Sequence, residues 1–203
     1  MTTDNGRSST ELRIWIPYLL LLVLLVASGV TAFLSSHSPG SMTGPEGVAV
    51  FNVPDLAPAS STLAGQPIDG VSCPTGSQEV VKYHIHVHVA VYVNGRMVRL
   101  PAGIGITKPA LKLTTPSGTF YDVGSHDCIY WLHTHVADGI IHVEAPAKAG
   151  FTLGQFFDVW HQPLGPQQVG PEKGTVVVFE NGKEMKGDPR LTPLLPHGVI
   201  QID

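Results

Sequence analysis

Residues 83–95 of the chain read YHIHVHVAVYVNG. Successive side chains of a β-strand point to opposite faces, so a strand here places His84, His86 and His88 on one face. The other face carries only Tyr, Ile and Val, up to an Asn-Gly pair that is a strong signal for a tight hairpin turn. We therefore predict a strand with one apolar face for a core and one histidine face for chemistry.

A second histidine-bearing segment is WLHTHVADGIIHVE, residues 131–144. Its Asp-Gly pair favours a turn between two strands. A four-residue turn predicts that His133 lies opposite His142, whereas a two-residue turn predicts that His135 lies opposite His142. The shorter turn also puts His133 opposite Glu144. Both registers keep these four side chains on one face, because the pairing shifts by two residues.

Imidazoles and a carboxylate on neighbouring strands can share one cation, because cross-strand Cβ atoms lie about 5 Å apart. These donors suit zinc or copper first, and also iron or manganese. The competing interpretations are histidines on a solvated sheet face and a cluster that responds to pH. The cost of burying unpaired imidazoles favours metal binding. The predicted ligands are His84, His86, His88, His133, His135, His142 and Glu144.

Seven such groups exceed the four or five ligands that one transition-metal ion takes, so either two ions bind or some groups support the others. The candidates for a supporting hydrogen bond are Asp127, Asp138 and Tyr92. His126 is a candidate peripheral ligand, and His161, His37 and His197 are expected outside the site.

Residues 14–34 carry no charge and are dominated by Leu, Val and Ile. As a helix they would span about 31 Å, enough to cross a bilayer. Arg7 and Arg13 precede this run and the next basic residue is Lys82, which predicts a cytoplasmic N-terminus and export of the remainder. We predict an uncleaved signal anchor that makes the lipid bilayer a partner, with a cleaved signal peptide and secretion as the alternative.

The predicted organisation follows from this segment. Residues 1–13 form a cytoplasmic tail, and residues 35–71, rich in Ser, Gly, Pro and Ala, form a flexible linker with one short strand near residues 48–53. Residues 72–203 form the extracytoplasmic histidine-rich domain. The two cysteines, Cys73 and Cys128, are expected to form a disulfide because the compartment is oxidising.

The rest of the chain predicts a mainly β (α+β) fold, a compact β-sheet or barrel-like domain with one short helix. Residues 176–185 repeat the strand, Asn-Gly, strand pattern. Thr152 can cap a helix over residues 153–160, whose apolar residues recur with helical spacing. Residues 199–202 predict a final strand that closes the sheet.

Four motifs, at residues 83–88, 128–135, 138–144 and 151–157, together resemble a family of uncharacterised exported proteins of bacteria and archaea. The resemblance covers about residues 70–203 and implies no particular activity.

The net charge of −4 and the scattered basic residues exclude a nucleic-acid groove. We expect a membrane-tethered extracytoplasmic protein that captures, buffers or delivers zinc or copper. The alternatives are a metal-dependent envelope enzyme with a His/Glu site and a structural envelope domain stabilised by an ion. The sequence leaves open whether catalysis occurs, and it does not indicate protein partners.

Overall fold

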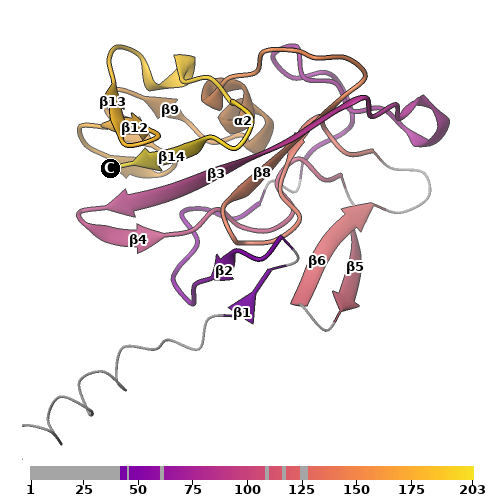
Figure 1. Ribbon diagram of the computed structural model, residues 1–203, viewed down its shortest axis with the longest axis horizontal. Helices are drawn as coiled ribbons and strands as arrows, with labels where there is room; N and C mark the ends of the chain where they lie inside the picture. The colour runs from indigo at the N-terminus through magenta and orange to yellow at the C-terminus, as the bar shows by residue number, and fades with distance from the viewer. Residues whose placement is uncertain (1–41, 45, 60–61, 108–109, 116–117, 124–127) are drawn as a thin grey trace, which may run out of the picture. The chain divides into compact units, whose positions relative to one another are not determined.

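The computed structural model describes residues 42–203 apart from residues 45, 60–61, 108–109, 116–117 and 124–127 (Figure 1). The predicted tail at residues 1–13, the predicted membrane segment at residues 14–34 and the start of the predicted linker lie outside the described residues. Within the described part, no helix has the length and apolar character needed to span a bilayer.

The described residues form a mainly β domain with one α-helix, which confirms the predicted class. The main sheet has the order β13-β12-β14-β3-β8-β7, and β4 pairs with β3 (Figure 1). Its order runs from one edge strand to another, so the domain is built on an open sheet and not on a barrel. The strands of this sheet are β3 (Tyr83–Val93), β4 (Arg96–Val98), β7 (Leu132–His133), β8 (Ile140–Ala145), β12 (Val178–Glu180), β13 (Lys183–Met185) and β14 (Val199–Ile202).

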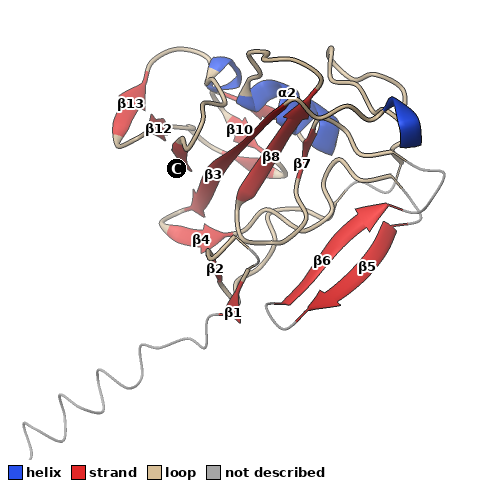
Figure 2. Ribbon diagram, turned by 45° about the vertical axis from the view of Figure 1, so that its right-hand side comes forward, coloured by secondary structure: helices blue, strands red, loops and turns tan. Residues whose placement is uncertain are grey.

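Smaller elements surround this sheet (Figure 2). Two are two-stranded hairpins, β1–β2 and β5–β6, and one is a three-stranded sheet of β9, β10 and β11. Their bounds are β1 (Met42–Thr43), β2 (Ala49–Val50), β5 (Ala110–Thr115), β6 (Gly118–Val123), β9 (Leu164–Gly165), β10 (Gln168–Val169) and β11 (Glu172–Lys173). The 3-10 helices are η1 (Gly76–Gln78) and η2 (Pro189–Leu191).

Strand β3 has the two faces that its alternation predicts. Val87, Val89 and Val91 are buried in the main core, whereas His84 is exposed and His86 and His88 are half-buried. Removing the valine side chains from water stabilises the sheet by about 1.5–3 kcal/mol each. The histidine face is thereby held in place by the packing behind it.

Helix α2 (Leu153–Trp160) has the predicted bounds and packs its aromatic face into the same core. Thr152 accepts a hydrogen bond from the Gln155 backbone N–H, and the Gln155 side chain accepts one from the Thr152 N–H. This reciprocal capping satisfies two amides that the first helical turn leaves unpaired. The helix ends at His161, which adopts a left-handed backbone with φ 59°.

Both predicted Asn-Gly hairpins are present. Asn94 and Gly95 join β3 to β4 with φ values of 51° and 72°, and Asn181 and Gly182 join β12 to β13 with φ values of 50° and 77°. The predicted final strand is also present as β14. It does not close the sheet at an edge, because it lies between β12 and β3 and runs parallel to β3.

The described part of the predicted linker packs on the domain instead of forming a loose tether. Leu56 is buried in the main core. The Pro58 carbonyl accepts a hydrogen bond from Trp160 Nε1 at 2.9 Å, and the Gln66 carbonyl accepts one from the Tyr130 hydroxyl at 2.7 Å. The predicted short strand in this segment is β2. A few apolar anchors and backbone carbonyls therefore order a segment whose composition is typical of linkers.

The predicted disulfide between Cys73 and Cys128 is present, with the two Cα atoms 5.4 Å apart. It links segments 55 residues apart, just before β3 and β7 respectively. Closing so long a loop stabilises the fold mainly by restricting the unfolded chain.

Candidate metal centre

Strand β8 lies between the two other histidine-bearing strands, β3 and β7. His142 on β8 is opposite His86 on one side and opposite His133 on the other. The β7–β8 pairing is the one that the longer of the two predicted turns requires. Glu144 is opposite His84. The register therefore gathers side chains from three strands on one face of the sheet.

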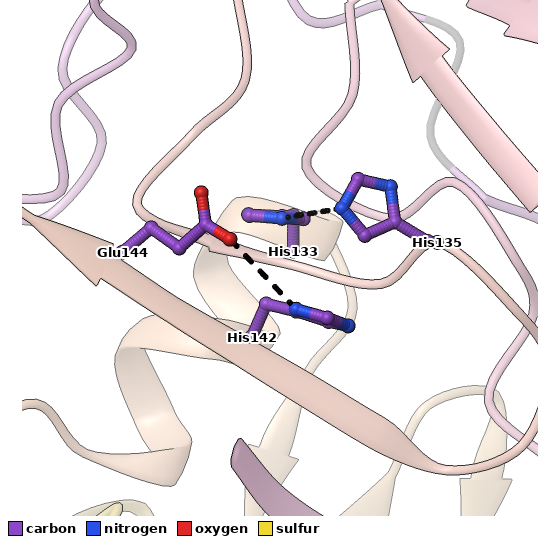
Figure 3. A group of neighbouring side chains, drawn as sticks. All are labelled: His133, His135, His142 and Glu144. Atoms are coloured by element: carbon purple, nitrogen blue, oxygen red, sulfur yellow. Dashed lines mark hydrogen bonds and ion pairs between the residues drawn. The ribbon is translucent and has the colours of Figure 1, made fainter. Parts of the chain in front are cut away.

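Two overlapping sets of side chains have ligand atoms that all lie within 4.8 Å of one another. We call the first set, His133, His135, His142 and Glu144, the inner group (Figure 3). The second set is His84, His86 and His142, and we call its two β3 residues the outer pair. These His/Glu groups could hold a metal ion.

His133 and His135 each have one ring nitrogen fixed by a backbone carbonyl. His133 Nδ1 lies 2.8 Å from the Tyr130 carbonyl oxygen, and His135 Nδ1 bonds the carbonyl of Tyr121 on β6. A carbonyl oxygen only accepts, so both Nδ1 atoms carry the proton. In the neutral rings, the Nε2 atoms are therefore left with lone pairs.

These two Nε2 atoms face each other (Figure 3), and they are 3.1 Å apart. Two lone pairs at this distance repel, and a positive charge between them, from a metal ion or an extra proton, would relieve that repulsion. Burial lowers the pKa of His133 well below its usual value, and His135 and His142 lower it further. Burial therefore disfavours the extra proton on His133, which leaves the lone pair of its Nε2 available to a metal ion.

In His142 the two ring nitrogens have the opposite roles: Nε2 has the outer oxygen partner, and Nδ1 faces the other ligands. Its Nε2 lies 3.3 Å from Glu46 Oε1, whereas its Nδ1 is buried without a hydrogen-bond partner among the described residues. That Nδ1 lies 3.8 Å from Glu144 Oε1. Burial, and then His135, His86 and His84, lower the pKa of His142 to about 3, so the ring is neutral and its Nδ1 offers a lone pair.

The inner group thus repeats one pattern at every imidazole. One nitrogen is bound to an oxygen outside the group, and the other offers a lone pair to the interior of the group. Ligand histidines in metal sites have this arrangement, because the outer hydrogen bond fixes the tautomer and the orientation of the ring. With the Glu144 carboxylate, the group offers four donors, the number that closed zinc sites use.

The backbone between His133 and His135 is held from behind. The fully buried Thr134 hydroxyl donates to the Pro101 carbonyl at 2.8 Å and accepts from the Ile104 N–H at 3.1 Å. Gly105 lies so close that a Cβ there would be 2.3 Å from the Leu132 carbonyl oxygen, and its φ is 71°. Only glycine fits this position without moving the backbone next to His133.

The outer pair is more open. The two Nε2 atoms of His84 and His86 are 3.0 Å apart, and His84 Nε2 is 3.2 Å from Glu144 Oε1. The His84 side chain is 47% exposed. Among the described residues, no hydrogen bond fixes the Nδ1 atom of either ring.

His88, the third predicted ligand on β3, belongs to neither set. Burial lowers the pKa of His88, and the backbone of Asp138 partly offsets this by raising it. The Asp138 side chain accepts from the Ile140 N–H at 3.0 Å. Burial raises the pKa of Asp138 to about 6, with Ile140 lowering it and the Glu46 carboxylate raising it further.

The other candidates lie apart from both sets or outside the description. His161 ends α2, with its Nδ1 3.3 Å from the Thr62 hydroxyl, and His197 is exposed. Tyr92 lines a separate surface cavity together with Val169. His37, His126 and Asp127 lie outside the described residues.

Three supports of the inner group are absent from the predicted site: Glu46 and the carbonyls of Tyr121 and Tyr130. Glu46 lies in the turn between β1 and β2, within the predicted linker, and no spacing relates it to the histidines. Every residue has a carbonyl, so no residue type indicates the other two supports.

Comparisons with protein-family models, curated proteins and solved structures find no match to this chain. The resemblance to exported histidine-rich proteins stays a prediction, and function has to be inferred from the geometry of the site.

Proposed function

We propose that this domain binds a divalent transition-metal ion at the inner group and captures, buffers or delivers that ion outside the cytoplasm. The observation that supports binding is the set of three imidazoles, each with one nitrogen bound to an outer oxygen and the other directed at its neighbours. The extracytoplasmic, membrane-tethered location depends on the apolar run at residues 14–34.

Zinc or copper(II) is the metal proposed for this site. Imidazole and carboxylate donors suit both ions, whereas copper(I) prefers thiolates or thioethers. Both cysteines of the chain form the disulfide, so they offer no thiolate.

Binding is favoured over catalysis by the completeness of the donor set. A catalytic zinc site keeps one position for water or substrate, whereas a closed site fills all four positions with protein groups. His133 and His142 are buried, and four protein donors converge.

A metal-dependent enzyme is the second candidate because a small cavity reaches the inner group. His133 and Glu144 line this cavity together with Glu79, Val81 and Trp131. If Glu144 ceased to be a ligand, the ion would have an open coordination position facing this cavity. A water molecule or a small substrate could then bind the ion there.

The test is metal retention by the purified full-length chain, prepared without a polyhistidine tag. The chain is stripped with a chelator, exposed to Zn²⁺ or Cu²⁺, dialysed and analysed for metal. We expect the wild type to retain at least about one equivalent, and His133→Gln with His135→Gln to abolish tight retention. His197→Gln, an exposed histidine outside both sets, is the matched control.

Equal retention by the wild type and the double variant would refute the proposed site, as would no retention by either. A domain that merely needs a stabilising ion would show a different result. Metal would raise its melting temperature, while cells lacking the protein would respond normally to metal limitation or excess.

A further inference from the structure

The donors on this face outnumber what one ion can take. Beyond the four of the inner group, His84 and His86 add two further imidazoles on the neighbouring strand. Glu144 Oε1 lies between the two sets, 3.2 Å from His84 Nε2 and 3.8 Å from His142 Nδ1. A transition-metal ion with protein ligands usually takes four or five donors.

We propose that the outer pair forms a second cation site, so that the domain holds two divalent transition-metal ions that share Glu144 between them. This inference rests on the proposed function, because it assumes that the inner group binds metal. His142 also lies within reach of both sets, but its Nε2 faces Glu46 and its Nδ1 faces Glu144. The carboxylate, with two oxygens, is therefore the group best suited to bridge two ions.

The contacts of the outer pair bring its donor atoms close enough to share one cation. The nitrogens of His84 and His86 approach to 3.0 Å, and the carboxylate oxygen lies next to one of them. In two-metal sites a shared carboxylate offsets the repulsion between cations about 3.5–4 Å apart.

The two sites differ in exposure, which predicts an order of filling. His133 and His142 are buried, His135 is half-buried, and all three are oriented by outer oxygens. The His84 side chain is 47% exposed and lacks such support among the described residues. The inner site should therefore bind more tightly, and the outer site should exchange its ion with solvent more readily. An ion captured at the outer pair would reach the inner group through the shared carboxylate.

A simpler arrangement competes with this one. His84 and Glu144 could form only an ion pair, with His86 hydrogen-bonded to His84 and no second cation. Stoichiometry separates the two arrangements.

The experiment is a calorimetric and equilibrium-dialysis titration of the metal-free full-length chain with Zn²⁺. We expect about two equivalents for the wild type, the second bound at least about tenfold more weakly. His84→Gln with His86→Gln should remove the weaker equivalent and keep the tighter one. His133→Gln with His135→Gln should lose the tighter one, and His197→Gln should behave as the wild type.

The outcomes distinguish failure of this inference from failure of the proposed function. One equivalent in both the wild type and the His84→Gln, His86→Gln variant overturns the second site and leaves the inner site standing. Loss of all binding in that variant also overturns it, since a single ion would then use both sets. No binding by the wild type refutes the proposed function itself.

A spectroscopic measurement guards against misfolding of the double variant. With two equivalents of Cu²⁺, ions that share a carboxylate should give a magnetically coupled electron paramagnetic resonance spectrum. The exposed single substitution His84→Gln, checked by circular dichroism, should convert this spectrum to that of isolated Cu²⁺. An uncoupled spectrum in the fully loaded wild type contradicts a shared ligand.

Discussion

The inner group and the outer pair present the same side chain from neighbouring strands, yet they differ in what holds each ring. Every imidazole of the inner group has an oxygen partner on its second nitrogen, provided by Tyr130, Tyr121 or Glu46. Among the described residues, the outer pair has no such partner. Alternation along a strand therefore brings imidazoles together, while segments distant in sequence determine which of them are oriented for an ion.

The largest effect should follow from breaking the Cys73–Cys128 disulfide. By the loop-closure estimate, opening a loop of 55 residues costs about 4 kcal/mol of unfolding free energy. Cys128 lies two residues before Tyr130, whose carbonyl fixes His133, so inner-site affinity should fall more than outer-site affinity. Urea unfolding and Zn²⁺ titration of oxidised and reduced chain measure both effects. Equal weakening of the two sites would show that the support does not depend on this bridge.

Removing the carboxylate partner of His142 should have the next largest effect. Glu46→Ala should weaken the inner site roughly 10- to 100-fold, the range for such outer partners, and Glu46→Gln should weaken it less. The outer equivalent should be retained. Zn²⁺ titration measures both, with the exposed Glu172→Gln as the matched control. Unchanged inner affinity in Glu46→Ala would mean that the turn between β1 and β2 does not orient His142.

The metal-free protein should lose stability as pH falls below about 6.5, because the unfolded chain protonates His133 and His142 while the folded chain keeps them neutral. Each such group contributes up to about 1.4 kcal/mol per pH unit. Asp138 acts in the opposite direction. Its folded pKa of about 6 lies above its ordinary 3.8, so its contribution to stability is lost as pH rises through that range.

Thermal unfolding of the metal-free chain between about pH 7.5 and 5 measures this slope. His142→Gln should flatten it, and Asp138→Asn should steepen it below pH of about 6. A slope unaffected by His142→Gln would indicate that the ring already carries a proton in the folded state.

The smallest effect is expected from His88→Gln. His88 shares a strand face with the outer pair but belongs to neither set of donors. Both Zn²⁺ affinities should therefore stay within about twofold of the wild type, because a substitution away from both sets changes the free energy by less than about 0.5 kcal/mol. If this variant lost either of the two bound Zn²⁺ ions, His88 would be a metal ligand, as the alternation along β3 predicts.

The parts of the fold predicted from sequence are those that local chemistry specifies. The faces of β3 follow from period-two alternation, the hairpins at Asn94 and Asn181 from the need for positive φ, and α2 from its cap and apolar spacing. The pairing of Cys73 with Cys128 followed because the chain has no other cysteine.

The remaining features depend on contacts between residues distant in sequence. Both possible turn lengths at Asp138-Gly139 place the same four side chains on one face of the sheet. Alternation alone therefore could not determine the register of β7 and β8. The linker composition around Glu46 concealed a segment that packs through a few anchors such as Leu56. Which β3 histidines lie near the other donors depends on where β7 and β8 end. The sequences of these two strands do not mark those ends.

Strand β14 joins two parts of the main sheet, and this position affects how the domain folds. The β12–β13 hairpin joins the histidine-bearing half of the main sheet only through β14, which pairs with β3 across a long separation in sequence. Until Val199–Ile202 dock, β3 has a free backbone edge beside its histidines, a surface prone to pairing with other chains. Pairing of strands that are distant in sequence is slow, so the folding chain would pass through a stage that is prone to aggregation and that can bind metal through an incomplete set of ligands.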